Sequence, residues 1–238
     1  MPPAANAGIN SPTLLSSPFA LIALGYWADS RGFEPTQEES QGIRRWLLIA
    51  NAKGRWSRGS SDSLLDQDIA TIRDGGGYQQ LLDRLALQVG RLDIQALDLE
   101  GRTSRSSLFK TMFLAFAQDG AKDWNSNLSI SVKHAGAQDK LQFHHIFPKA
   151  FLRDSGLDYK TSQVDDISNL AFIGGSTNLK ISAKAPSNYL KKLAERADHP
   201  LEAQQVPLDT SLYSPDRYLA FLAVRRELIA KRLNEFLT

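Results

Sequence analysis

The chain has 238 residues, of which 42% are hydrophobic and 23% charged, a composition typical of a globular protein with a buried core. No run approaches eighteen consecutive apolar residues, which excludes a membrane span, and the first ten residues lack the basic and apolar segments of a secretory signal. The absence of cysteine excludes disulfides, thiol catalysis and cysteine-ligated zinc. The net charge of +2 neither predicts nor forbids nucleic-acid binding. We therefore expect a globular protein of the cytoplasm.

The first half of the sequence has the hydrophobic periodicity of helices and no convincing strand. Ile43, Trp46 and Leu47, for example, recur at positions i, i+3 and i+4, which places them on one helical face. Pro18 interrupts the earliest of these segments. Helices are expected over residues 13–27, 38–52, 60–73, 78–89 and 106–117.

Basic and aromatic residues alternate along the second of these helices and the loop behind it, an arrangement that can meet a DNA backbone. The helical spacing of Trp46 favours a place in the core instead, and we expect the arginines on a solvated face. The stretch comprises Arg44, Arg45, Trp46, Lys53, Arg55, Trp56 and Arg58.

The sequence changes character near residue 120, where polar, glycine-containing segments separate short strand-like pieces. The alternation Leu-Ser-Ile-Ser-Val at 128–132 is typical of a strand, as are two later apolar runs. Strands are expected at 128–132, 141–147 and 170–174, a helix or turn after Gly174-Gly175 at 176–184, and a long helix at 215–237. Together the two halves predict a mostly α protein of the α+β class.

Two adjacent histidines, His144 and His145, end an apolar strand and precede Ile-Phe-Pro. Imidazole ligates metal ions well and titrates near neutral pH, so one ring can hold an ion while its neighbour acts as a base. A bare His-His pair is more often a pair of inactive loop residues. Here, however, Asn169 precedes the next strand and Asn178 lies in the helix that follows it.

This order of parts closely resembles the HNH, or His-Me finger, endonucleases with their ββα-metal unit. The likeness is greatest to the C-terminal HNH domain of GmrSD-type modification-dependent restriction endonucleases, in which HIFP, I-x-N-L and N-x-x-I-S-x-K are usual. The matching segments are HIFP at 145–148, ISNL at 167–170 and NLKISAK at 178–184. The upstream segment 44–69 is similar to the helical region that precedes the nuclease unit in those proteins.

Members of that group carry an N-terminal ParB-like domain with an Asp-Gly-Gln-Gln-Arg motif, which senses DNA modification or hydrolyses nucleotide. The motif does not occur here, so the resemblance implies the C-terminal portion of such a protein, with the ParB-like domain as an absent partner. Anti-phage effectors of the SspE kind, which depend on phosphorothioate DNA, form one subgroup. The expected domains are a helical part at 1–130, the HNH unit at 131–195, and a C-terminal helix at 196–238 that packs on the helical part.

Carried over residue by residue, the resemblance implies that His145 is the general base that activates water. Asn169 would hold the loop backbone and orient His145, and His144 and Asn178 would ligate one divalent ion. Mg²⁺ is the expected ion because it prefers sparse, oxygen-rich sites, although a histidine ligand also suits Mn²⁺, Ni²⁺ or Zn²⁺. The implied function is nicking or cleavage of DNA in bacterial defence.

Charged residues flank the expected site. Lys180 and Lys184 are candidates for contacts to DNA phosphates, and Lys149 is a weaker one. Asp165 or Asp166 could approach the ion as a third ligand, although we favour loop-capping carboxylates on a solvated turn. Two other functions stay open: an HNH-like module that binds DNA or a partner without cutting, and a helical interaction module whose His-His-Ile-Phe-Pro segment is structural.

Overall fold

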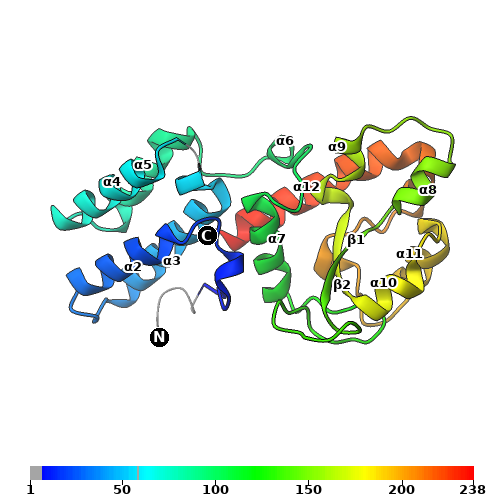
Figure 1. Ribbon diagram of the computed structural model, residues 1–238, viewed down its shortest axis with the longest axis horizontal. Helices are drawn as coiled ribbons and strands as arrows, with labels where there is room; N and C mark the ends of the chain where they lie inside the picture. The colour runs from blue at the N-terminus through cyan, green and yellow to red at the C-terminus, as the bar shows by residue number, and fades with distance from the viewer. Residues whose placement is uncertain (1–6, 58) are drawn as a thin grey trace. The chain divides into compact units, whose positions relative to one another are not determined.

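The computed structural model describes residues 7–57 and 59–238. This part of the chain is mostly helical, as predicted, and contains a two-stranded antiparallel sheet (Figure 1). None of its helices combines the length and the apolar character needed to cross a bilayer. The α-helices are α2 (Phe19–Ser30), α3 (Gln37–Lys53), α4 (Ser61–Arg73), α5 (Tyr78–Val89), α6 (Ala96–Leu99), α7 (Ser107–Gln118), α8 (Lys149–Asp154), α9 (Thr161–Val164), α10 (Gly175–Ile181), α11 (Pro186–Ala194) and α12 (Tyr218–Phe236), and the strands are β1 (Leu141–His145) and β2 (Leu170–Gly174).

The chain folds into two compact units that interleave in sequence. The first combines the residues up to Asp93 with Ser106–Leu114 and Leu237–Thr238, and the second combines Ile94–Arg105 with Ala115–Phe236. This division differs from the expected one, which placed a boundary at residue 130 and packed the C-terminal helix on the helical part. α12 belongs to the second unit, where it contacts α6 and the 3₁₀ turn Ile167–Asn169 that leads into β2.

The first unit is built around α3. A capping box begins this helix: the Thr36 hydroxyl accepts the backbone N–H of Glu39, and the Glu39 carboxylate accepts that of Thr36. Trp46 is fully buried, as predicted, and packs edge-to-face on Trp56 with 5.7 Å between the ring centroids. The aromatic residues of the basic stretch are therefore core residues.

The basic stretch also differs from the expected solvated face at Arg55. This side chain is buried and donates to both carboxylate oxygens of buried Asp68, at 2.7 and 2.5 Å. A buried, bidentate pair of this kind is structural, because the guanidinium cannot leave it without exposing an unpaired charge to the core. Arg58 lies outside the described residues.

The sheet of the second unit is short, with Phe143 opposite Phe172 and His145 opposite Leu170. α10 follows β2 directly, whereas the short helices α8 and α9 lie between β1 and β2 in the chain (Figure 1). We call β1, β2 and α10 the strand–strand–helix segment. The outer edge of β2 is covered by Gln204, whose side chain accepts the N–H of Phe172 at 2.8 Å and donates to its carbonyl at 2.9 Å. Gln204 thereby satisfies backbone groups that a third strand would pair.

α12 supports the same region through Arg225, which is fully buried. Its guanidinium donates to the carbonyls of Ser168 at 2.8 Å and Leu170 at 2.9 Å, and also to those of Gln204 and Gln205. Burial lowers the pKa of Arg225 to about 9. These bonds explain why the C-terminal helix belongs with the sheet.

Several expected elements differ in the structure. The helix expected at 13–27 begins at Phe19, after Pro18, and the strand expected at 141–147 ends at His145. Residues 128–132 do not form a strand but a single antiparallel bridge, Ser129 with Lys122. The Asp123 carboxylate accepts the N–H groups of Asn125 and Ser126 and curls the chain just before this segment, so no long partner lies beside it. The helix expected at 215–237 begins as a 3₁₀ turn, Pro215–Arg217, before α12.

Candidate active site

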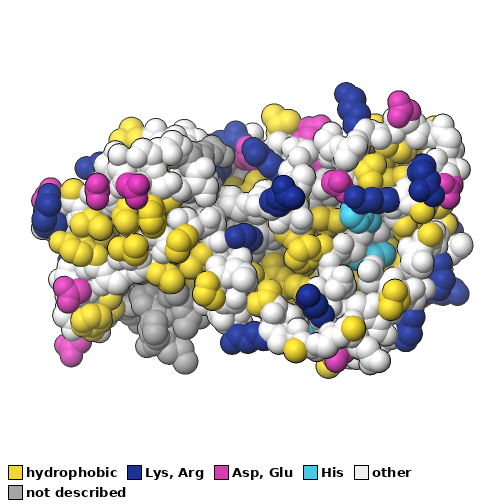
Figure 2. Space-filling view, in the orientation of Figure 1, with side chains coloured by type: hydrophobic (Ala, Val, Ile, Leu, Met, Phe, Trp, Pro, Cys, Tyr) yellow, Lys and Arg dark blue, Asp and Glu magenta, His cyan; other side chains and the backbone are white. Residues whose placement is uncertain are grey.

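The four residues expected to form a site lie at the strand–strand–helix segment. His144 and His145 end β1, Asn169 closes the 3₁₀ turn that leads into β2, and Asn178 lies on α10. Successive strand residues face opposite sides, and accordingly His144 is 3% exposed whereas the His145 side chain is 23% exposed. Figure 2 shows histidine side chains at the surface of this unit, with basic and acidic groups beside them.

Asn169 holds the backbone that follows His145. Its Oδ1 accepts the N–H of Phe147 at 2.8 Å, and its Nδ2 donates to the carbonyls of Phe147 and Val164 at 3.2 and 3.0 Å. The Asn169 carbonyl accepts the N–H of Ile146 at 2.8 Å. All of these bonds join Asn169 to backbone groups. The buried amide therefore fixes the backbone position from which His145 projects.

His145 is paired with a carboxylate. Its Nε2 lies 3.0 Å from Oδ1 of Asp165, and the Lys149 ammonium lies 2.6 Å from the same oxygen. Burial would raise the pKa of Asp165, but these two contacts hold it below its usual range, so the group is ionised at neutral pH. An ionised carboxylate only accepts hydrogen bonds, so a neutral His145 carries its proton on Nε2 and keeps the lone pair on Nδ1.

The protonation state of His145 is set mainly by burial, which lowers its pKa. The hydrogen bond to Asp165 opposes this shift, whereas the positive charge of Lys149 adds to it. The net pKa lies below the ordinary value of 6.5, so the imidazole is neutral at pH 7. A neutral imidazole with one nitrogen oriented by a carboxylate is equipped to act as a general base.

His144 and Asn178 face each other across the segment. Nδ1 of His144 lies 2.8 Å from Oδ1 of Asn178, and its Nε2 lies 3.4 Å from the hydroxyl oxygen of Tyr189. That hydroxyl donates its own proton to the carbonyl of Ile146 at 2.6 Å, so it offers lone pairs to His144. Burial lowers the pKa of His144 to about 4, so this ring carries only one proton at neutral pH.

With Oδ1 of Asn178 directed at His144, the single proton of His144 can serve only one of its two contacts. If the proton is on Nδ1, the bond to Asn178 forms and Nε2 faces the Tyr189 oxygen unprotonated. If it is on Nε2, Tyr189 accepts it, and the lone pairs of His144 Nδ1 and Asn178 Oδ1 face each other at 2.8 Å. Neighbouring ligands in an octahedral shell of 2.0–2.1 Å radius lie about 3 Å apart. The second arrangement therefore fits a small divalent cation.

No acidic residue in the part of the chain that the structure describes joins His144 and Asn178 as a third candidate metal ligand. Within the described ranges, no group of three or more His, Asp or Glu side chains could hold a metal ion. Asp165 is engaged by His145 rather than lying on a solvated turn. Asp166 caps the turn through the N–H of Ser168, as favoured, but it is fully buried and also accepts the N–H of Gly101 at 2.8 Å.

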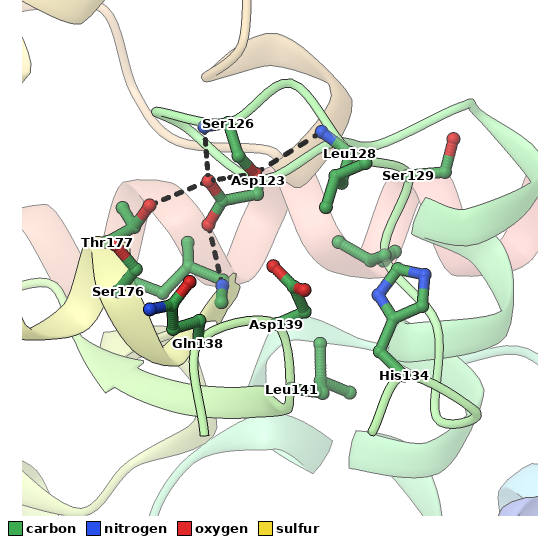
Figure 3. Close-up of a pocket in the computed structure, with 13 residues that line it drawn as sticks. Asp123, Ser126, Leu128, Ser129, His134, Gln138, Asp139, Leu141, Ser176 and Thr177 are labelled. Carbon is green, nitrogen blue, oxygen red and sulfur yellow. Dashed lines mark hydrogen bonds between the residues drawn. The ribbon is translucent and has the colours of Figure 1, made fainter. Parts of the chain in front are cut away.

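α10, which carries Asn178, is anchored at its start by Asp123 (Figure 3). The Asp123 carboxylate accepts the N–H of Gly174 at 2.6 Å and the hydroxyl of Thr177 at 2.7 Å. Burial would raise the pKa of Asp123, but the hydrogen bonds it accepts hold the pKa below its usual value. A Cβ at Gly175 would lie 2.1 Å from the carbonyl oxygen of Ala137, in the loop before β1, so only glycine fits there.

Two surface hollows adjoin His145, with volumes of about 440 and 320 Å³. The smaller contains His144 and Asn178, and the larger contains the loop 103–105 and Asp165. The residues that line both are Phe143, His145 and Lys149. His145 therefore lines both the hollow that contains His144 and Asn178 and a second, basic hollow that contains Arg105.

The expected phosphate contacts are distributed differently. Lys180 and Lys184 are exposed but line neither hollow, and the Lys184 ammonium donates to the carbonyl of Lys180 at 2.6 Å. Lys149, the weaker candidate, borders both. Neither Tyr189 nor the loop 103–105 can be recognised from the sequence, because an apolar helix position and a short polar loop carry no motif.

Comparison with known proteins gives one distant likeness. Over 159 residues, 64% of this chain, the sequence is 27% identical to the uncharacterized protein MJ0686 of Methanocaldococcus jannaschii. The matched region spans 25% of that protein's length. No family model and no solved structure match the chain. The case for a function therefore rests on the geometry of the site and the motifs that compose it.

Proposed function

We propose that this protein is a metal-dependent HNH endonuclease that nicks or cleaves DNA phosphodiester bonds. The observation that carries the proposal is that one strand–strand–helix segment holds a candidate general base next to a candidate metal-binding pair. A neutral His145 is held by an ionised carboxylate, and the acceptors of His144 and Asn178 lie beside it. The segment lies within residues 131–195, where the motifs place the HNH unit.

In this proposal His145 activates the attacking water. Its Nδ1 takes the proton as the water oxygen attacks phosphorus, and the imidazolium that forms keeps its Nε2–H directed at Asp165. The negative charge of Asp165 stabilises this cation, while Lys149 keeps the carboxylate ionised. Asn169 holds the backbone on which His145 sits, so it positions the base without touching the substrate.

His144 and Asn178 would hold the divalent ion, with Mg²⁺ expected and Mn²⁺, Ni²⁺ or Zn²⁺ as alternatives. The bound ion would neutralise charge on the phosphoryl oxygens and on the leaving alkoxide. Tyr189 accepts the Nε2 proton of His144 and thereby presents the Nδ1 lone pair to the site. Asn178 supplies an oxygen without adding a negative charge that would repel the DNA backbone.

The biological setting belongs to the same proposal. The wording of the three motifs supports the effector part of a bacterial modification-dependent restriction or anti-phage protein, acting in the cytoplasm. A ParB-like sensor or nucleotidase domain would then be the partner that controls cleavage. The residues described above account for the chemistry and assign no particular DNA sequence or modification.

The proposal is tested with supercoiled plasmid in Mg²⁺, Mn²⁺, Ni²⁺, Zn²⁺ or EDTA, together with Mn²⁺ binding followed by electron paramagnetic resonance. We expect ion-dependent conversion to open-circular or linear DNA. The variants His144→Ala and Asn178→Ala should weaken Mn²⁺ binding, with partial rescue of conversion at excess ion, whereas His199→Ala, which removes an exposed histidine, should not. A chain that neither converts plasmid with any ion nor binds Mn²⁺ would contradict the proposal.

A further inference from the structure

We propose that the loop 103–105 forms a second phosphate-binding subsite, for the phosphodiester that neighbours the cleaved one on the same nucleic-acid strand. The inference rests on the proposed function, because its ligand is part of the same substrate. The subsite is the larger hollow beside His145, and its lining includes Thr103, Ser104 and Arg105, whose side chains carry hydroxyl and guanidinium groups. Hydroxyl and guanidinium donors together suit phosphate oxygens.

The charge of this hollow is set by Arg105. Asp165 is the acidic residue in its lining, and the Lys149 ammonium lies 2.6 Å from the Asp165 carboxylate, so these two charges offset each other. Arg105 is exposed, and no acidic side chain forms an ion pair with it among residues 7–57 and 59–238. Its five donors are therefore free to bind an anion.

The two residues just before the loop are held by the buried scaffold of the site. The Asp166 carboxylate accepts the N–H of Gly101 at 2.8 Å, and the carbonyl of Arg102 accepts the N–H of Ile167 at 2.8 Å. Asp166 is itself fully buried and paired with Arg226 at 2.6 Å. The start of the loop is thus tied to the two residues that follow Asp165, which reduces the conformational freedom that the loop would lose when a phosphate binds.

Phe143 lies between the two hollows, where a nucleic-acid strand that occupies both would cross. It lies two residues before His145 on β1, on the same face of the strand, and its side chain lines both hollows. The ring is 48% exposed and is supported edge-to-face by buried Phe172. An exposed, supported ring offers a surface for a sugar or base, with one phosphate on either side of it.

The test measures binding of a fluorescein-labelled DNA duplex in EDTA over a range of salt concentrations, so that no cleavage intervenes. Loss of one phosphate contact should reduce the slope of log K against log[salt] by about 0.9. We expect this change for Arg105→Ala. Arg105→Lys should retain the slope but weaken binding, because lysine keeps the positive charge and loses the planar guanidinium that can donate two parallel hydrogen bonds to a phosphate. Arg217→Ala, which removes an exposed arginine outside both hollows, is the matched control.

A kinetic measurement separates this inference from the proposed function. With the most active ion, Arg105→Ala should raise KM for plasmid several-fold and leave kcat within about twofold, because the loop does not touch the reacting atoms. Nicking by the wild type together with identical behaviour of Arg105→Ala and Arg217→Ala would overturn the subsite and leave the nuclease standing. A wild type that neither binds nor nicks DNA would overturn both.

Discussion

Nε2 of His145 lies 3.0 Å from Oδ1 of Asp165, and this contact determines which nitrogen of the histidine is free. Because the carboxylate is ionised, Nε2 carries the proton and Nδ1 remains basic. Asp165 belongs to the polar segment before the turn Ile167–Asn169, so the loop that Asn169 anchors also carries the partner of His145. Asn169 therefore bonds to the backbone close to both groups, at Phe147 after the base and at Val164 before its orienting carboxylate.

Asp165→Asn should slow nicking and move its acid limb to lower pH. Burial already places the pKa of His145 below 6.5, and Asp165 opposes that shift, so removal of the negative charge lowers the pKa further. The neutral base then persists at lower pH, but the imidazolium loses its partner, which should cost roughly a hundredfold in rate. A single-turnover pH–rate profile measures both effects.

The matched control for this change is Asp154→Asn, which removes an exposed carboxylate on α8 that pairs with its neighbour Arg153. Its profile should overlay that of the wild type. An acid limb that stays in place or moves to higher pH in Asp165→Asn would show that Asp165 does not act on His145.

Tyr189→Phe should weaken ion binding about tenfold, because the hydroxyl that would accept the Nε2 proton of His144 in the proposed ion-binding tautomer is lost. Tyr213→Phe is the matched control: Tyr213 is also buried and donates at 2.6 Å to a backbone carbonyl, that of Pro207, but has no contact with His144. Mn²⁺ titration compares the two variants. Equal losses in both would assign the effect to general destabilisation rather than to the histidine tautomer.

His144 should make the metal-free protein lose stability as the pH falls. Its folded pKa of about 4 lies below the ordinary 6.5, so between these values the unfolded chain binds a proton that the folded chain does not. Above pH 6.5 the effect vanishes, and near pH 4 it reaches about 3 kcal/mol. Urea unfolding in EDTA at pH 7 and pH 4.5 should show a smaller loss for His144→Asn than for the wild type. Equal losses would contradict burial of a neutral His144.

Arg225→Met should lower the free energy of unfolding by about 3 kcal/mol or more, because buried carbonyls next to β2 lose their donor. Methionine fills similar volume, so the effect reports the hydrogen bonds more than the packing. Arg217→Met, at an exposed position, should change stability by less than about 0.5 kcal/mol. A loss below about 1 kcal/mol for Arg225→Met would remove this residue from the support of the sheet.

Much of the fold could be predicted from local periodicity. Residues 78–89 form α5 as expected, the predicted segment 38–52 is one residue shorter than α3 at each end, and the segment 60–73 begins one residue before α4. The apolar runs around Phe143 and Phe172 form the two strands. These elements could be predicted because each is determined by residues close in sequence.

The missed features depend on contacts between distant residues. Nothing near Arg225 in the sequence shows that this arginine will be buried against the backbone of β2. The spacing of Asp165 in the sequence fits a loop cap or a metal ligand and does not reveal that its carboxylate reaches His145. Residues 128–132 alternate like a strand, but a strand needs a partner, and Asp123 turns the chain away from one.

The most direct test of the central claim compares His145→Ala with His199→Ala in single-turnover nicking of supercoiled plasmid, with the ion that supports the fastest wild-type reaction. Loss of the general base should slow the reaction by about 10²- to 10⁴-fold, with Mn²⁺ binding and thermal stability retained. His199→Ala, at an exposed position, should nick at the wild-type rate. Equal nicking rates for the two variants would contradict the assignment of His145 as the base and, with it, the proposed nuclease mechanism.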